Sequence, residues 1–294
     1  MAITAALVKE LRDRTGLGMM DCKNALQESD GNVEQAIDEL RKKSALKAAK
    51  KAGRTTAHGL LGVKISTDGK RAAMVEINCE TDFAAKNDKF VSFVDTALNG
   101  VFDRGDDDLE KLLADGLNAE REALVQQIGE NITVRRVTFF GTDDGFITGY
   151  LHGDKRKAAL VELSGKNNEL GRDLAMHITA IGPLVVASAD VAQDLLAKER
   201  EIYLAQAQES GKPPEIIEKM VNGRVRKYLA EVSLLDQPFV KDGNVKVGAL
   251  LASADVECRR FARFEVGEGI KVEKSDFAAE VAAQVKDSDL KDPD

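Results

Sequence analysis

The stretch DGKRAAMVEIN, residues 68–78, and the stretch GDKRKAALVEL, residues 153–163, share one succession of features. Each has a turn, a basic pair, small residues and then an alternating apolar run that is typical of a half-buried strand. A second similarity links IGENITVRRV, residues 128–137, with VGEGIKVEK, residues 266–274. Because both similarities recur at similar relative positions, the sequence predicts an α+β unit that is built twice.

The segments around these stretches fit small antiparallel sheets. Residues 60–79 contain two strand-like runs on either side of an Asp-Gly dipeptide, which is a hairpin signal. Residues 149–165 repeat this pattern with a Gly-Asp turn. A helix is predicted after each pair of strands, at 83–98 and near 169–181. We therefore expect the α+β class with a duplicated core.

Helical segments flank and interrupt this core. Residues 1–54 predict three short helices, which form a small module attached to a larger body. Residues 190–208 and 215–232 predict an antiparallel helical hairpin around a Gly/Pro turn, and charged outer faces favour a projecting arm. A last helix is predicted at 275–285. The hairpin residues expected to face one another are Val191, Leu195, Ile202, Ala205, Ile216, Met220, Val225 and Leu229.

Composition narrows the classes of partner. The chain of 294 residues has 42 Lys and Arg against 50 Asp and Glu, a net charge of -8. A net acidic chain lacks the field that drives non-specific binding to nucleic acid, so a protein or a small ligand is the better expectation. The first 14 residues place charges within their apolar pattern, and no apolar run approaches the ~20 residues that span a bilayer. We expect a cytoplasmic protein without a membrane partner.

Catalytic and metal-binding motifs are missing from the sequence. It contains no GxSxG, no HExxH and no phosphate-binding loop. Three cysteines and three histidines lack the spacing of a disulfide framework or a zinc site. We therefore expect no enzyme, no cofactor and no metal site. His152 lies near Asp154 without a third orienting residue, so it is either a polar turn residue or a contact for a partner. Catalysis by His152 is the rival hypothesis.

Two further features of the N-terminal segment have alternative interpretations. Met19 and Met20 are adjacent on a helix, so we expect one to point outward, as a harmless exposed residue or as an adaptable contact. A basic tract between residues 41 and 54 is either a solvated helix end or an RNA patch. Its members are Arg41, Lys42, Lys43, Lys47, Lys50, Lys51 and Arg54.

The segment NCETDFAAKND, residues 78–88, also has two interpretations. Asp82 is a favourable residue for a helix N-cap, which leaves Phe83 free to be a buried contact of the helix. The other hypothesis makes Asp82 and Phe83 a probe that is pushed into a partner. Residue types alone do not decide between them.

Several segments resemble the bacterial translation elongation factor Ts family. LRDRTGLGMMDCKNAL (11–26) and EINCETDFAAK (76–86) match its two signature segments. The resemblance continues in AMHI (175–178), SGKPPEIIEKMV (210–221) and RFEVGEGIKVEKSDFAAEVAA (263–283). Ala84 departs from the family, which usually has valine after the Asp-Phe pair, and Leu17 stands where small residues also occur.

The resemblance implies an architecture with five parts. A ubiquitin-associated-like helical module leads a two-part core, a helical hairpin is inserted into the second part, and a helical module ends the chain. The expected boundaries are 1–54 for the first module, 55–140 for the N-terminal half of the core, 141–182 with 229–263 for its C-terminal half, 183–228 for the hairpin and 264–294 for the last module.

The resemblance also implies a function. It predicts a guanine nucleotide exchange factor for the GTPase elongation factor Tu, bound in its GDP-bound and nucleotide-free forms. Thr81, Asp82 and Phe83 would reach the magnesium and phosphate region of that partner. The other implied contacts are Arg12, Met19 and Met20 from the N-terminal module, Ile128, Gly129 and His152 from the core, and the helix at 275–285.

In some members of the family the hairpin is associated with dimer formation. A homodimer or a 2:2 complex through the hairpin is therefore one assembly that the resemblance implies, whereas direct contact with nucleic acid is not expected.

Overall fold

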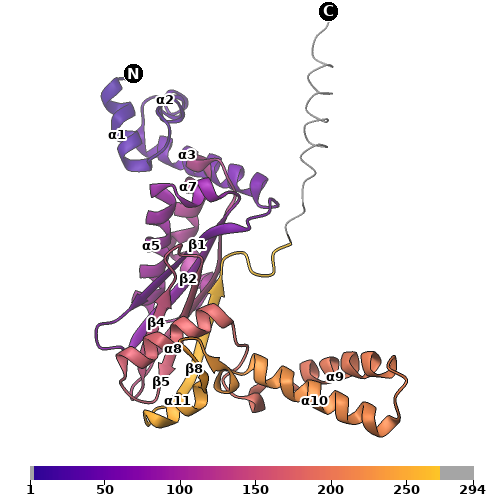
Figure 1. Ribbon diagram of the computed structural model, residues 1–294. Coiled ribbons are helices and arrows are strands. Elements are labelled where there is room, and N and C mark those ends of the chain that lie inside the picture. The colour runs from indigo at the N-terminus through magenta and orange to yellow at the C-terminus, as the bar shows by residue number, and fades with distance from the viewer. Residues whose placement is uncertain (1–2, 272–294) are drawn as a thin grey trace, which may run out of the picture.

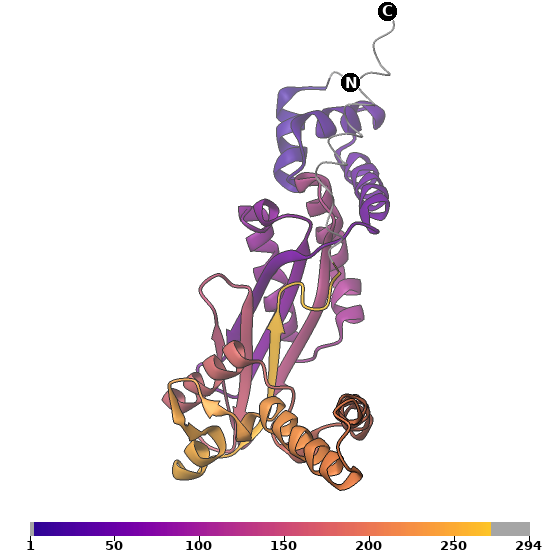
Figure 2. The ribbon, with the colours of Figure 1, turned by 45° about the vertical axis from the view of Figure 1, so that its right-hand side comes forward.

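The structure is a computed structural model and describes residues 3–271 of the chain. The helix predicted at 275–285 lies outside these residues. Figures 1 and 2 show an elongated molecule with the N-terminal helices at one end and a helical hairpin at the other. No helix among the described residues is long and apolar enough to cross a membrane.

Three short helices form the N-terminal module around their own small core. Thr4 caps the first helix by accepting a hydrogen bond from the Leu7 N–H, and Asn32 caps the third in the same way. The helices are α1 (Ala5–Thr15), α2 (Met19–Glu28) and α3 (Val33–Lys51). Their buried residues include Leu11, Leu17, Cys22, Ala25, Leu26 and Leu40.

Two antiparallel sheets of three strands make up the centre of the molecule, which confirms the α+β class. The strand orders are β1-β2-β3 and β4-β5-β8, so β2 lies in the middle of the first sheet and β5 in the middle of the second. The strands are β1 (His58–Ile65), β2 (Arg71–Cys79), β3 (Ile132–Gly141), β4 (Phe146–Leu151), β5 (Lys157–Leu163) and β8 (Cys258–Glu265).

Each sheet has a helix on its outer face and the other sheet on its inner face. Helix α5 (Asp88–Arg104) packs on the first sheet, and α8 (Asn168–Ile181) packs on the second. The alternation of side chains along β2 and β5 produces this layering, because successive residues point to opposite faces. The core between the sheets contains Leu61, Ala72, Met74, Phe140, Ile147, Ala158, Leu160 and Phe264.

The two sheets are joined by reciprocal backbone hydrogen bonds. The Ile147 N–H donates to the Gly69 carbonyl at 2.7 Å, and the Leu61 N–H donates to the Lys155 carbonyl at 2.8 Å. Gly69 (φ +68°) and Lys155 (φ +56°) therefore occupy the same place in the two turns. A Cβ at Gly69 would collide with the ring of Phe146, so glycine is required there.

The third strands also correspond, and here one sequence prediction is wrong. RRVTFF, residues 135–140 of β3, matches RRFARF, residues 259–264 of β8, and the first arginine of each lies at the register shift beside the central strand. In the second similarity taken from the sequence, residues 132–137 lie within β3 but residues 266–271 follow β8. Those segments are not equivalent, because a Gly-rich turn precedes one strand and follows the other.

The remaining elements lie around the sheets. They are α4 (Asp82–Ala85), α6 (Leu109–Leu112), the kinked turn Leu113–Leu117, α7 (Asn118–Ile128), the short turns Ser188–Asp190 and Leu234–Asp236, α9 (Gln193–Gln208), α10 (Pro214–Val232), β6 (Pro238–Phe239), β7 (Asp242–Lys246) and α11 (Val247–Ser253). Two of the boundaries that the resemblance implied fall inside single elements. The boundary after residue 263 lies within β8, and the boundary after residue 228 lies within α10.

Helices α9 and α10 form the projecting hairpin (Figure 1), but the predicted pairing of its faces is wrong in part. Ala207 and Val221 are its buried residues, whereas Ile202 and Ile216 are 49% and 45% exposed. Apolar spacing alone does not fix the rotation of a helix that carries so few apolar residues.

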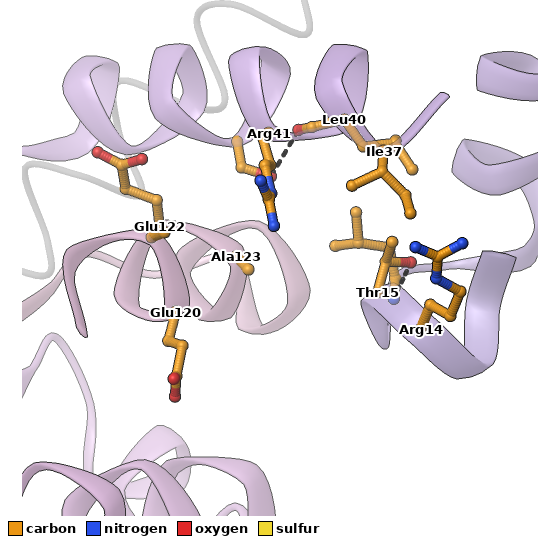
Figure 3. A pocket seen from close by; sticks show the side chains of 11 residues that line it. Arg14, Thr15, Ile37, Leu40, Arg41, Glu120, Glu122 and Ala123 are labelled. Atoms are coloured by element: carbon orange, nitrogen blue, oxygen red, sulfur yellow. Dashed lines mark hydrogen bonds between the residues drawn. The ribbon is translucent and has the colours of Figure 1, made fainter. Parts of the chain in front are cut away.

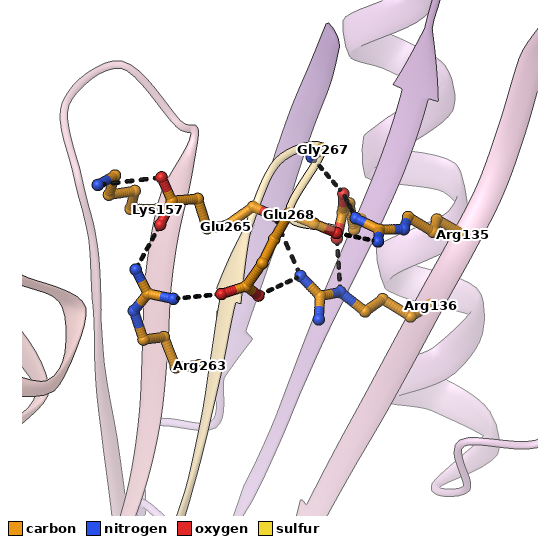
Figure 4. A network of polar contacts seen from close by, with 8 residues as sticks. Arg135, Arg136, Lys157, Arg263, Glu265, Gly267 and Glu268 are labelled. Atoms are coloured by element: carbon orange, nitrogen blue, oxygen red, sulfur yellow. Dashed lines mark hydrogen bonds and ion pairs between the residues drawn. The ribbon is translucent and has the colours of Figure 1, made fainter. Parts of the chain in front are cut away.

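A buried carboxylate holds the first sheet against the segment that follows β8, and Figure 4 labels its partners Arg135, Arg136 and Gly267. Glu76 is fully buried and accepts hydrogen bonds from Arg135 (2.9 Å), Arg136 (2.5 Å) and the Gly267 N–H (2.9 Å). Burial by itself would raise the pKa of Glu76, but the Gly267 N–H and the two guanidinium groups outweigh it and lower the pKa. Glu76 is therefore charged at neutral pH.

Replacing Glu76 with alanine should lower the free energy of unfolding by about 3 kcal/mol, because Arg135 loses its carboxylate partner and Arg136 keeps only its 3.3 Å pair with Glu268. Lys227→Ala is the control, since its 3.6 Å pair with Glu231 is exposed and should contribute less than about 0.5 kcal/mol. Urea denaturation measures both variants. Equal effects of the two substitutions would contradict a structural role for Glu76.

Candidate functional site

The segment between β2 and α5 forms a single-turn helix, α4, and not the start of one long helix. The predicted helix at 83–98 is broken because the Asn87 side chain accepts a hydrogen bond from the Lys89 N–H (2.9 Å) and begins α5 anew. Thr81, and not Asp82, is the N-cap of α4, since its hydroxyl accepts from the Ala84 N–H at 3.2 Å. Asp82 is the first residue of the helix.

The tip of this turn carries an exposed aromatic ring. Phe83 is 79% exposed, whereas Ala84 and Ala85 are buried in the first core. The expectation that Phe83 packs as a buried helix contact is therefore wrong. Asp82 pairs with Lys86 at 2.7 Å, and this hydrogen bond lowers the pKa of the Asp82 carboxyl. The tip thus presents a ring beside a carboxylate that is charged at neutral pH.

Thr81, the first residue of this turn, is held by hydrogen bonds to Glu130 and Cys79, and we call it the base of the turn. The Thr81 N–H and hydroxyl donate to the two carboxylate oxygens of Glu130, at 2.9 and 2.6 Å. The Cys79 thiol donates to the Thr81 carbonyl at 3.1 Å. Burial, reinforced by the charge of Glu130, raises the pKa of this thiol to about 12, so it stays protonated and remains a donor. An exposed tip therefore stands on a fixed base.

Ile128 and Gly129 lie beside this base. They end α7, where Gly129 takes φ +86° and its N–H donates to the Val125 carbonyl at 2.9 Å. Ile128 is half-buried against the first core, and the surroundings of the Gly129 Cα are open. Since Glu130 follows directly, the structure brings Ile128 and Gly129 together with the turn at Thr81.

Arg12, Met19 and Met20 lie together on the N-terminal module. They line a hollow of about 590 Å³ between α1 and α2, with Val8 at its apolar floor. Met19 is 59% exposed and Met20 is 63% exposed. The sequence predicted only one outward methionine. Both are accessible, because α2 is buried through Cys22, Ala25 and Leu26 on its other side.

Helix α7 holds the N-terminal module on the core. The Ser44 hydroxyl donates to the Gln126 side chain at 2.6 Å, and the Lys89 ammonium bonds the Gly16 carbonyl (3.1 Å) and Gln127 (2.7 Å). A pocket of about 270 Å³ remains between α1, α3 and α7, and Figure 3 shows the side chains that line it. The surface of the methionines is thereby held in a fixed orientation to the turn at Thr81.

His152 is placed apart from the turn. It follows β4, is half-exposed and pairs through Nδ1 with Asp154 at 2.9 Å. This hydrogen bond lowers the pKa of Asp154. The turn that carries His152 is connected to the first sheet through the Leu61 N–H of β1, which donates to the Lys155 carbonyl. Within residues 3–271, no group of three or more His, Cys, Asp or Glu side chains could hold a metal ion.

Several cations of the basic tract already have partners within the chain. Lys51 also donates to the Gly129 carbonyl, which ties the end of α3 to the end of α7. This engagement favours a helix end that packs on the core over an RNA patch. The ion pairs are Lys42–Glu39, Lys43–Glu28 and Arg54–Glu80.

Sequence reasoning missed Glu130 and Glu80. Glu130 binds Thr81 across 49 residues, and Glu80 accepts a hydrogen bond from the Asn131 N–H at 2.6 Å across 51. No local pattern pairs residues that are so far apart. Only the strand pairing of Cys79 with Ile132 brings the two segments together.

Comparison with known proteins identifies the family. The sequence profile described as Elongation factor TS matches residues 80–268, which include the turn, Glu130 and the whole of both sheets after β2. The chain belongs to the elongation factor Ts family. Its family places it in the elongation stage of protein biosynthesis.

Relatives named elongation factor Ts extend this similarity to the N-terminal module. The protein from Hahella chejuensis is 54% identical over 97% of this chain and 99% of its own length. The protein from Marinobacter nauticus is 54% identical over 96% and 97%. The elongation factor Ts of Methylococcus capsulatus is 50% identical over 98% of this chain and its own full length.

Replacing Phe83 with alanine should change the free energy of unfolding by less than about 0.5 kcal/mol, because its ring is largely in solvent. Phe90→Ala, at a fully buried position of α5, should cost about 3–5 kcal/mol. Chemical denaturation of both variants tests this contrast. A loss for Phe83→Ala as large as that for Phe90→Ala would make Phe83 a core residue.

Proposed function

We propose that this chain is a guanine nucleotide exchange factor for elongation factor Tu and accelerates the release of GDP. The exposure of Phe83 on a base held by Glu130 is the observation that carries the proposal. A large ring costs free energy when left in water, so an exposed and anchored ring favours a contact with a partner. Membership of the elongation factor Ts family supplies the choice of partner.

In the proposed mechanism Phe83 enters the partner between helices near its nucleotide site, with Asp82 close to the bound magnesium. Magnesium demands near-ideal octahedral geometry, so a small displacement of its ligands weakens its binding. The phosphates of GDP then lose part of their electrostatic anchor, and GDP leaves faster. No bond is made or broken, so the chain acts without enzymatic chemistry and without a cofactor of its own.

Binding of this protein and binding of GDP oppose each other in the proposed cycle. The protein lowers the affinity of the partner for GDP by a certain factor. GDP lowers the affinity of the partner for the protein by the same factor, because coupling free energy is reciprocal. The protein therefore binds the GDP-bound partner, stabilises the nucleotide-free form and is released when a nucleotide returns. This exchange takes place in the cytoplasm, where the partner serves translation.

The other surfaces would position the partner. Arg12, Met19 and Met20 contact its nucleotide domain from the N-terminal module, since methionine adapts to an apolar groove. Ile128, Gly129 and His152 contact it from the core. The exposed Ile202 and Ile216 of the hairpin support a homodimer or a 2:2 complex through α9 and α10. We propose no direct contact with nucleic acid.

The Asp82→Ala/Phe83→Ala variant should remove most of the acceleration of GDP release, by about tenfold or more, while the protein stays folded. Stopped-flow release of fluorescent GDP from elongation factor Tu measures this rate. Asp107→Ala/Leu46→Ala is a matched control, because it removes an exposed acid and an exposed apolar residue that are not part of the turn.

If the wild-type protein left the rate of GDP release unchanged, this result would contradict the proposed function. Equal acceleration by wild type and by the Asp82/Phe83 variant would leave the exchange activity standing and remove its assignment to this turn.

A further inference from the structure

Glu130 engages both polar groups of Thr81 at once. One carboxylate oxygen accepts from the Thr81 N–H at 2.9 Å, and the other accepts from its hydroxyl at 2.6 Å. A hydroxyl has a single proton to donate, so this bond fixes its rotation. A lone pair is then left to accept from the Ala84 N–H at 3.2 Å. The carboxylate of Glu130 thus orients the cap that begins α4.

Glu130 is itself held where three segments meet. Gly129, with φ +86°, turns the chain out of α7 directly before it, and the Lys51 ammonium donates to the Gly129 carbonyl. The Asn131 side chain, directly after it, donates to the carbonyls of Ala52 and Arg54, at 3.3 and 3.0 Å. The end of α3, the end of α7 and the start of β3 therefore hold the backbone on both sides of Glu130.

We infer that Glu130 is a positioning residue that sets the direction of the Phe83 ring for nucleotide exchange. This inference rests on the proposed function. Glu130 acts through Thr81, whose N–H and hydroxyl it binds. It also connects the N-terminal module to the turn, because the residues on either side of it bind the end of α3.

The direction of Phe83 matters for exchange more than for folding. The ring is 79% exposed, so the folded chain alone gains little from one direction over another. Ala84 and Ala85 are buried in the first core, so we expect the turn to persist when Glu130 is replaced. A ring that samples several directions enters the partner less often in the productive one. The maximal rate of exchange should therefore fall more than the affinity for the partner.

The test compares wild type with Glu130→Ala and Glu130→Gln in stopped-flow release of fluorescent GDP from elongation factor Tu. At saturating protein, Glu130→Ala should lower the maximal rate about tenfold, while the half-saturating concentration changes less than about threefold. Glu130→Gln keeps one acceptor oxygen and should be intermediate. Glu120→Ala, an exposed acid on α7, is the control for loss of one negative charge.

A second arm separates positioning from a general loss of charge. Thr81→Val removes the hydroxyl and keeps the shape of the side chain. Both substitutions remove the bond between the Thr81 hydroxyl and Glu130, so the loss in the double variant Thr81→Val/Glu130→Ala should be clearly smaller than the sum of the two single losses. Fully additive losses would overturn the inference.

Amide hydrogen exchange at Thr81 and Ala84 gives a readout that does not depend on the partner. Both amides should lose protection in Glu130→Gln, with unchanged protection in the centre of β2. If wild type does not accelerate GDP release, the proposed function fails. Unchanged protection of the Thr81 amide in Glu130→Gln would overturn the role of Glu130, whatever the result for GDP release. A Glu130→Ala rate within twofold of wild type would also overturn it.

Discussion

Two buried carboxylates at equivalent places determine how the centre of this molecule is assembled. Glu76 on β2 binds the arginines at the bulge of β3, and Glu162 on β5 binds Arg260 (2.7 Å) at the bulge of β8. The same arginines stack on the opposite sheet. The guanidinium carbon of Arg136 lies 4.2 Å from the ring centre of Phe264, and that of Arg260 lies 4.1 Å from the ring centre of Phe140. A slip of one residue in either third strand would leave a buried charge unpaired, so the carboxylates fix the register of both sheets.

The position of the candidate site follows from this register. The pairing of β2 with β3 places Cys79 opposite Ile132, and only then does Glu130 lie below Thr81. The two alanines after Phe83 are buried in the core and stabilise the turn, whereas the ring of Phe83 itself stays in solvent. The turn can therefore keep its shape without help from Phe83, which leaves the ring available to a partner.

The periodicity of the sequence predicted much of the fold and less of the site. Apolar alternation and turn dipeptides located the central strands, and helical spacing located α8 and the projecting hairpin. Helix α4 was beyond such patterns, because a single turn has too few residues for periodicity to show that Phe83 faces outward. The clamp of Thr81 by Glu130 spans 49 residues, and the bond of Arg260 to Glu162 spans 98. Contacts of this kind depend on strand pairing and have no local signal.

The structure of the complex with nucleotide-free elongation factor Tu, determined by cryo-electron microscopy or crystallography, tests the central claim most directly. In this complex the Phe83 ring should be buried in the partner next to its empty nucleotide site, with Asp82 facing the former magnesium position. Thr81 should still donate both hydrogen bonds to Glu130. A Phe83 ring that remains in solvent, or that contacts the partner far from the nucleotide site, would contradict the account.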